Sequence, residues 1–286
     1  MEGISTYVYR IACQGEIFYL RVLPEEDASF ASEVTVHTQL RRGQVKVPDI
    51  IYFEHCNDLL QRSIMVTTEI KGQPISDSYS LSKEALEGIL IEAGQDLARI
   101  NSVTVEGYGW IKRGRGDGEC LHAQWPVHRS FALEFWEVDL AYLRNAVLTA
   151  SEIVRLECVL ARYNDWLDVE QGYLAHGDLD ATHIYQEDGQ YSGIIDFGEI
   201  RGASRYYDLG YFHMRDGERV PARLAPSLIH GYREIVPLPS GYDHRVCFAS
   251  LLINIRALAR SLQKRPANQY TSHQLQVLRE DLAFLL

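Results

Sequence analysis

The feature that most restricts the fold of this chain is the stretch LAHGDLDATHIYQEDGQYSGIIDFGEI, residues 174–200. Within it, His176, Asp178 and His183 precede one short turn, and Asp196 follows that turn. A carboxylate buried among apolar strands without partners carries a large desolvation penalty. Several such groups in one apolar stretch therefore indicate a functional site.

The segments HIYQ and YSGIID flank EDGQ, and an Asp-Gly pair between strands is a strong signal for a β-hairpin. With residues 188–189 at the centre of the turn, counting outward places His183 opposite Ile194. Directly opposed residues, and residues two apart on a strand, share a face of the sheet. We therefore expect His183 and Asp196 on one face, roughly 7–8 Å apart at the backbone and within reach of one metal ion. A register slip of one residue would destroy this arrangement.

Asp178 lies in the loop before the first strand of this hairpin. A loop aspartate beside two potential metal ligands can act as a general base or as a third ligand. Taken singly, an aspartate at a strand end is more often a turn former, and a lone histidine is more often a hydrogen-bonded structural residue. Their combination, with consistent facing, favours the interpretation as a site.

The chain of 286 residues is 46% hydrophobic and 23% charged, which is ordinary globular usage and suits two domains or two lobes of one enzyme. No apolar run approaches the ~20 residues that span a bilayer, and MEGISTYVYR does not read as a signal peptide. The five cysteines are scattered and form no C-x-x-C pair. This argues against a disulfide framework or a zinc site, and we expect a cytoplasmic protein with no membrane partner.

The formal net charge of −11 argues against a nucleic-acid-binding protein, because affinity for the phosphate backbone depends mostly on Lys and Arg. The charge has two remaining interpretations. It can simply confer solubility, or it can mark an acidic cleft that attracts a cationic substrate. Composition does not decide between them.

The first seventy or so residues read as a small antiparallel sheet, with strand-like segments TYVYRIA, EIFYLRVL, DIIYFEH and SIMVTTEI. The turn CQGE predicts a hairpin between the first two, and DASFASEVTVHTQLRR predicts one inserted helix that ends before Gly43. Gly72 and Pro74 mark a lobe boundary, and helical spacing begins after the potential N-cap Ser82. We expect a β-rich lobe over residues 1–72 and a larger, mainly helical lobe over residues 73–286 that carries the hairpin.

Two motifs, HGDLDATH and IIDFGE, resemble the H-R-D-x-x-x-x-N and D-F-G segments of protein kinases. With Gly in the second position, the pair is similar to the aminoglycoside phosphotransferase family of kinase-like enzymes. RYYDLGYF resembles a further segment of that family, and so does LARINSV, in which Asn101 stands where His is usual. The resemblance extends from Gly3 to about Phe212. It implies an α+β, protein-kinase-like, two-lobed fold.

The resemblance also implies roles for residues of the helical lobe. Asp178 would be the catalytic base, and His176 and Asp208 would support the catalytic loop. Asp196 would bind Mg²⁺, with His183 in the position where many kinases carry Asn. Hard cations prefer oxygen ligands, but some macrolide and aminoglycoside phosphotransferases resemble this chain in having His there.

In the β-rich lobe, the resemblance implies a site for ATP or GTP. YLRV places Arg21 where the family carries a basic residue to the phosphates, with Glu33 as its partner, although a solvated position for either is the alternative. GISTYVYR resembles the turn that covers the phosphates, which puts Ser5 beside them. TTEIKG resembles the segment that joins the lobes, whose backbone near Glu69 and Ile70 would bind the base.

The expected reaction is transfer of the γ-phosphoryl group of ATP or GTP to a hydroxyl of a small molecule, such as an aminoglycoside- or macrolide-like antibiotic or a metabolite. The protein would be a monomer or a homodimer, with no nucleic-acid partner. Two alternatives are a kinase-like module that binds nucleotide without transfer, and a metallohydrolase with His176, Asp178, His183 and Asp196 as ligands. The helical lobe and catalytic region supply the candidates for substrate contacts, which are Trp125, Glu134, Trp136, Glu137, Asp139, Asp180 and Glu199.

Overall fold

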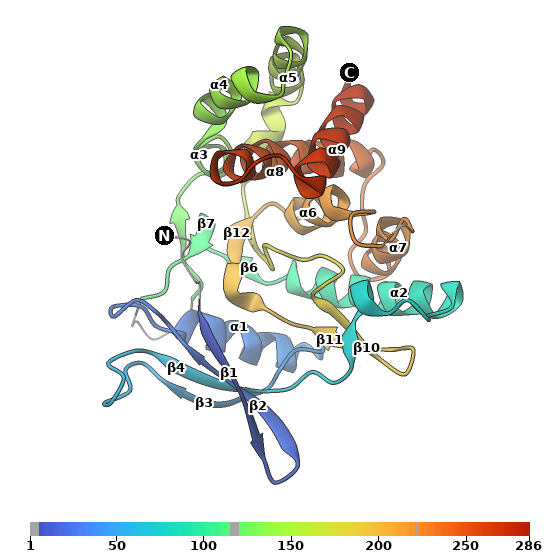
Figure 1. Cartoon of the computed structure of the whole chain (residues 1–286). Helices are drawn as coiled ribbons and strands as arrows, with labels where there is room; N and C mark the ends of the chain where they lie inside the picture. The colour runs from blue at the N-terminus through green and yellow to red at the C-terminus, as the bar shows by residue number, and fades with distance from the viewer. Residues whose placement is uncertain (1–5, 115–119, 221) are drawn as a thin grey trace.

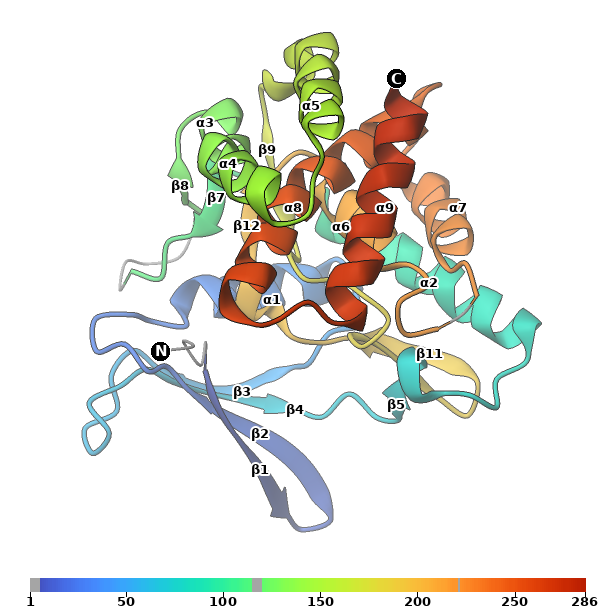
Figure 2. The same ribbon diagram turned by 45° about the horizontal axis from the view of Figure 1, so that its top comes forward.

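The computed structural model describes residues 6–114, 120–220 and 222–286. Its N-terminal lobe is a four-stranded antiparallel sheet in the order β1-β2-β4-β3, with one helix between the sheet and the second lobe (Figures 1 and 2). Gln14 and Gly15, both at positive φ (53° and 88°), make the tight turn between the first two strands. The predicted hairpin and inserted helix are confirmed. The elements are β1 (Tyr7–Cys13), β2 (Glu16–Val22), α1 (Ala31–Arg42), β3 (Ile50–Glu54) and β4 (Ile64–Thr68).

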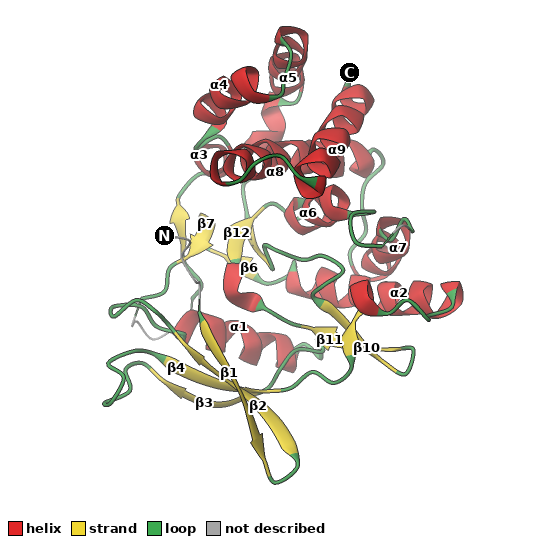
Figure 3. Ribbon diagram, in the orientation of Figure 1, coloured by secondary structure: helices red, strands yellow, loops and turns green. Residues whose placement is uncertain are grey.

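The second lobe is mainly helical (Figure 3). Ser82 caps the first helix by accepting a hydrogen bond from the backbone N–H of Ala85, as predicted. The segment from residue 128 to residue 146 forms two helices separated by a short break, and two further helices lie between residues 207 and 235. The helices are α2 (Lys83–Ile100), α3 (His128–Ala132), α4 (Trp136–Ala146), α5 (Ala150–Arg162), α6 (Tyr207–Arg215), α7 (Ala225–Ile235), α8 (Tyr242–Lys264) and α9 (Gln269–Leu285), with short 3₁₀ turns η1 (Ile75–Asp77), η2 (Asn164–Leu167) and η3 (Phe197–Glu199).

Two small sheets position the polar residues of the second lobe. In one, β5 (Gln73–Pro74) pairs with β10 (Ile184–Glu187), which pairs with β11 (Gln190–Ile194). The segment directly after residue 72 therefore pairs with the catalytic hairpin. The lobe boundary at residue 72 stays a prediction. The other sheet has the order β6-β9-β12-β7-β8, built from β6 (Thr104–Val105), β7 (Tyr108–Ile111), β8 (Ala123–Trp125), β9 (Gly172–Ala175) and β12 (Arg201–Ala203).

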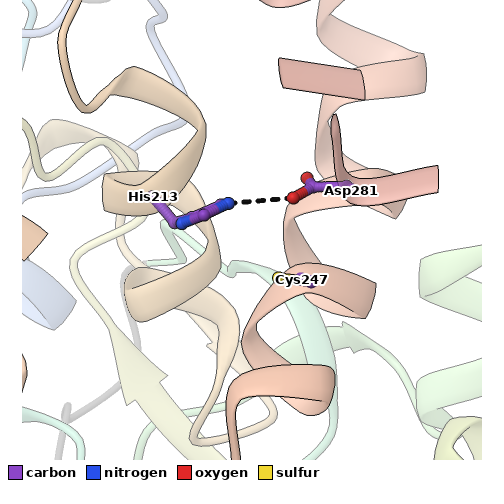
Figure 4. Close-up of side chains that lie close together, drawn as sticks. All are labelled: His213, Cys247 and Asp281. Carbon is purple, nitrogen blue, oxygen red and sulfur yellow. Dashed lines mark hydrogen bonds and ion pairs between the residues drawn. The ribbon is translucent and has the colours of Figure 1, made fainter. Parts of the chain in front are cut away.

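A buried polar network ties three helices together behind the catalytic region (Figure 4). Asp281 on α9 is 2% exposed and accepts hydrogen bonds from Ser250 (2.6 Å) and from the ring of His213 (2.9 Å). Burial and the nearby Asp281 raise the pKa of the Cys247 thiol, which therefore stays protonated. A protonated thiol is a poor metal ligand. Since the three groups satisfy one another, we interpret them as a structural clamp rather than a metal site.

Among the described helices, none is long and apolar enough to cross a membrane. Within the helical lobe, α2 lies beside α7 in both views (Figures 1 and 2). A Cβ on Gly94 of α2 would lie 2.0 Å from the carbonyl oxygen of Leu228 on α7. A Cβ on Gly231 of α7 would lie 1.9 Å from the carbonyl oxygen of Ile91 on α2. The two helices therefore cross with their backbones in contact, which only glycine permits.

Gly94→Ala should lower the free energy of unfolding by about 1–3 kcal/mol, because the added methyl group forces the two helices apart. Gly88→Ala is the matched control on the same helix, since a Cβ at this exposed position meets nothing within 4 Å. It should raise stability by about 0.5–1 kcal/mol through helix propensity. Urea denaturation measures both. Equal effects of the two substitutions would contradict a backbone contact at Gly94.

Candidate active site

The catalytic hairpin forms, but its register differs from the prediction. Glu187 opposes Gln190 as expected, yet Ile184, not His183, opposes Ile194. The pairing shifts by one residue between Tyr185 and Gln186, which leaves a bulge at Ser192. The hydroxyl of Ser192 donates to the carbonyl oxygen of Lys71 (2.8 Å), so the bulge docks this strand against the segment that joins the lobes.

His183 and Asp196 nevertheless converge, with His183 Nε2 and Asp196 Oδ2 3.9 Å apart. The convergence does not come from strand alternation. Asp196 lies beyond the end of β11 in a left-handed conformation (φ 66°, ψ 66°), and its carboxylate accepts a hydrogen bond from the N–H of Gly198. Such a conformation costs of order 1–3 kcal/mol for a residue other than glycine and is typical of functional sites. It turns the carboxylate toward the imidazole and compensates for the register shift.

The hydrogen bonds of His183 fix its tautomer. Its Nδ1 lies 2.7 Å from the carbonyl oxygen of Asp178, which can only accept, so Nδ1 carries the proton. In the neutral ring, Nε2 then presents a lone pair toward Asp196. An imidazole nitrogen and a carboxylate oxygen facing one site are a donor set that fits one divalent cation completed by phosphate oxygens and water.

Asp178 is half-buried on the wall of a large cavity. Its carboxylate accepts a hydrogen bond from the hydroxyl of Tyr211 on α6. Burial and the charge of Asp178 raise the pKa of Tyr211 well above its usual range, so this phenol stays a proton donor. Tyr211 therefore orients the carboxylate. The sequence alone did not identify this role, because it depends on α6 packing against the loop that carries Asp178.

His176 is a fully buried, neutral link between the catalytic loop and the hairpin. Burial lowers the pKa of its ring, and the neighbouring His183 lowers it further. Nε2 donates to the carbonyl oxygen of Ile195 (2.9 Å), while Nδ1 accepts from the N–H of Asp178 (3.3 Å). With both nitrogens hydrogen-bonded to backbone, His176 is not available to a metal. This weighs against the metallohydrolase alternative.

Asp208 braces the same loop from α6. Its carboxylate is completely buried and accepts hydrogen bonds from the backbone N–H groups of His176 (2.8 Å) and Gly177 (2.9 Å). Asn101, in the position where the family usually has His, donates to the same carboxylate (2.8 Å) and to the carbonyl oxygen of Leu174 (2.9 Å). Asp208 and Asn101 thus hold the backbone of the loop by hydrogen bonds, and the supporting role in catalysis that the resemblance implies for Asp208 and His176 stays a prediction.

The predicted pair of Arg21 and Glu33 forms, joining β2 to α1. Both side chains are nearly buried, with 11% and 5% of the side chain exposed. Burial raises the pKa of Glu33, and the charge of Arg21 opposes that rise. A Cβ on Gly198 would lie 3.4 Å from Arg21 Nη2 and 3.2 Å from Asp196 Oδ1, so the guanidinium lies beside the turn that carries Asp196. Arg113 was not predicted from the sequence to lie at this turn, yet its Nη2 donates to the carbonyl oxygen of Gly198 (2.8 Å).

The remaining predicted nucleotide contacts stay predictions. Glu69 follows β4 in the segment that joins the lobes, where its carboxylate accepts from the hydroxyl of Tyr19 (3.3 Å) and faces Arg10 (3.9 Å). Ile70 follows it, and the binding of a base by this backbone is untested. Ser5 lies outside the described residues.

A cavity of about 1440 Å³ opens beside Asp178 toward α4 and α8. Of the candidate substrate contacts, the described lining includes Glu134, Trp136, Asp139 and Glu199, and does not include Trp125 or Glu137. Asp139 and Glu199 already pair with arginines, at 2.9 Å from Arg256 and 3.1 Å from Arg201. Their contact with a substrate stays a prediction.

The structure places Asp180 away from the cavity, so its contact with a substrate stays a prediction without support from the geometry. The side chain is buried, and the described cavity lining does not include it. Its carboxylate accepts from the N–H of Thr182 (2.8 Å) and pairs with Arg215 (3.0 Å). Burial alone would raise the pKa of Asp180, but the neighbouring His183, the hydrogen bonds from Thr182 and the charge of Arg215 lower it, so the ionised group acts as a structural anchor of the loop.

Comparison with known proteins agrees with this geometry. The sequence model of the phosphotransferase enzyme family matches residues 2–246. An aminoglycoside 3'-phosphotransferase of Enterococcus faecalis is 21% identical over 217 residues, which cover 73% of this chain and 76% of that protein.

Solved structures resemble the whole fold. A thermostable mutant of aminoglycoside phosphotransferase APH(4)-Ia superposes with a TM-score of 0.68 at 15% identity, covering 99% of this chain and 92% of that one. A ternary complex of such a mutant with ADP and hygromycin B gives a TM-score of 0.66 at 15% identity, with the same coverage. The GDP complex of aminoglycoside 2'-phosphotransferase-IIIa gives 0.62 at 18% identity, covering 100% and 92%.

These matches confirm the predicted two-lobed, kinase-like fold and the predicted resemblance. The family model alone covers most of the chain and includes the catalytic loop, the hairpin and Asp208. The chain belongs to the phosphotransferase enzyme family.

Proposed function

We propose that this small-molecule phosphotransferase moves the γ-phosphoryl group of ATP or GTP to an acceptor hydroxyl that lies in the cavity beside Asp178. One observation carries the proposal: Asp178 faces the cavity while its loop also holds His183 3.9 Å from Asp196. Arg21 lies beside the turn of Asp196 and brings a positive charge to the same place. The ADP–hygromycin B and GDP complexes of the similar structures support a nucleotide and a small-molecule acceptor.

Asp178 would accept or orient the proton of the acceptor hydroxyl. The carboxylate is suited to this because the hydroxyl of Tyr211 fixes one of its oxygens and the residue lines the cavity. The backbone of the loop is held in position, since the N–H groups of His176 and Gly177 donate hydrogen bonds to the carboxylate of Asp208. Most of the rate acceleration in phosphoryl transfer comes from such positioning and from charge stabilisation.

Asp196 and His183 would hold one Mg²⁺. A bound Mg²⁺ neutralises negative charge on phosphate oxygens. Within the chain itself, Arg21 would face the phosphates, and Glu33 would keep its guanidinium in place. The donor set contains one imidazole where oxygen ligands are usual, so the choice of metal ion is a property of this chain that can be measured. A cytoplasmic location and a monomeric or homodimeric state remain further parts of the proposal.

Asp178→Asn should lower kcat at least about 100-fold, because the amide keeps the hydrogen bond from Tyr211 but cannot accept the proton. Asp188→Asn at the exposed tip of the hairpin is the matched control, since asparagine tolerates the left-handed conformation (φ 52°) found there. The readout is phosphorylation of the acceptor, measured by mass spectrometry for aminoglycosides, macrolides, sugars, choline and homoserine. Full activity of Asp178→Asn would rule out its role, and ATP binding without any transfer would favour a silent nucleotide-binding module.

His183→Asn should raise the ratio of activity with Mg²⁺ to activity with Mn²⁺ several-fold, because an amide oxygen suits the harder ion and imidazole suits the softer one. The variant is assayed at saturating nucleotide with each metal titrated. Asp196→Asn provides the comparison and should lose activity with both metals. If His183→Asn leaves the metal preference unchanged, His183 is not a ligand.

A further inference from the structure

The charge of the acceptor cavity differs from that of the chain. Asp and Glu outnumber Lys and Arg by 39 to 28 in the sequence, whereas basic side chains at least equal acidic ones in the described lining of the cavity. Helix α8 supplies much of this basic character through Arg245, Arg256, Arg260 and Lys264, all of which line the cavity. The single acid of α8, Asp243, lies in its first turn and does not line it. The net charge therefore does not mark an acidic cleft for a cation.

Two of the lining arginines stack on aromatic rings. Arg205 stacks on Tyr173 with 3.8 Å between its Cζ and the ring centroid, and Arg245 stacks on Trp166 at 4.5 Å. Both are half-buried. Both also lie near Tyr206, where their charges oppose the rise in pKa that burial gives its hydroxyl. Two guanidinium groups thus gather at one aromatic part of the cavity.

These two arginines differ from most of the other arginines in the lining. Arg201, Arg215 and Arg256 each pair with a carboxylate within 3.1 Å. In the part of the chain that the structure describes, Arg205 and Arg245 have no carboxylate oxygen within 4.0 Å. A partly desolvated cation without a counterion attracts an anion strongly, and a guanidinium held flat on a ring presents its donor edge to one.

The acidic side chains of the lining do not cancel this preference. Asp168 is paired with Arg129 (2.9 Å). Glu134, Asp165 and Glu170 are exposed, so water and salt screen their charges. The half-buried arginines are screened less and therefore dominate the interaction with a bound acceptor.

We infer that the acceptor is a hydroxyl compound that also carries an anionic group, a carboxylate or a phosphate, bound by Arg205 and Arg245 against the aromatic wall of the cavity. This inference rests on the proposed function, because it assigns the substrate class of the same site. The cavity volume of about 1440 Å³ exceeds the roughly 300–1,000 Å³ of common ligand pockets, so an acceptor of several rings or a long chain fits. A polycationic acceptor would meet repulsion at this position.

Matched acceptor pairs test the charge preference by phosphoryl transfer. Gluconate with sorbitol, and pantothenate with panthenol, differ by a carboxylate in place of a hydroxymethyl group. Glucose 6-phosphate with glucose tests a phosphate, and kanamycin represents the cations. We expect at least tenfold higher kcat/KM for the anionic member of a pair than for its neutral partner. Preference for kanamycin or for the neutral members would overturn the inference while leaving the phosphotransferase activity established.

A binding assay decides the matter even if none of these acceptors is phosphorylated. The fluorescent probes are 1-anilinonaphthalene-8-sulfonate, an aromatic anion, and its uncharged analogue N-phenyl-1-naphthylamine, both with ADP and Mg²⁺ present. The double variant Arg205→Gln/Arg245→Gln should lower the affinity for the anionic probe at least tenfold and the affinity for the neutral probe less than twofold.

Arg233→Gln is the control, because Arg233 also stacks on an aromatic ring (Tyr242, 5.5 Å) but does not line the described cavity. It should change neither affinity. Equal effects of the double variant on both probes, or none on either, would overturn the inference. Circular dichroism verifies that the variants are folded. Absence of any nucleotide turnover by the unmutated protein would instead contradict the proposed function. Failure of the inference and failure of the proposed function are therefore distinguishable.

Discussion

The catalytic region depends on one buried carboxylate, that of Asp208, which fixes the backbone before Asp178 through two N–H groups. A buried carboxylate is stable only when hydrogen bonds replace its hydration. Here the loop and Asn101 supply them, so α6, α2 and the loop are held together by one group. Gly177 lets the same loop approach the turn after the hairpin closely, since a Cβ there would lie 2.0 Å from the carbonyl oxygen of Glu199.

The second constraint lies at the end of the hairpin, where a bulge and a left-handed residue act together. The bulge at Ser192 serves the contact with the segment between the lobes, and it shifts the register by one. Asp196 then reaches His183 only because its backbone adopts φ 66°. The left-handed residue and the bulge thus link the segment that joins the lobes, through Lys71, to the geometry of His183 and Asp196. Arg21 and Arg113 contact or approach the same turn from outside the catalytic loop.

Much of the fold could be predicted from local signals: the first hairpin from its turn, α2 from its N-cap and helical spacing, and the catalytic hairpin from Asp188 and Gly189. Candidate residues of the site could be named from the sequence, but the register of the hairpin that positions them could not. A bulge depends on tertiary contacts that no strand pattern encodes. The same limit applies to Asp180, whose partner Arg215 lies on a helix that was not foreseen. Arg205 and Tyr211 lie in RYYDLGYF, a segment that resembles the family, but neither they nor Arg245 could be assigned to the cavity before the packing of the helices was known.

The most direct test of the central claim is a crystal structure of the protein with Mg²⁺ and the non-hydrolysable nucleotide AMP-PNP. We expect Mg²⁺ at about 2.0–2.1 Å from a carboxylate oxygen of Asp196, with His183 beside it and the terminal phosphate turned toward Asp178. A terminal phosphate that points away from Asp178, or a metal ion that lies away from Asp196, would contradict the proposed roles of these two residues.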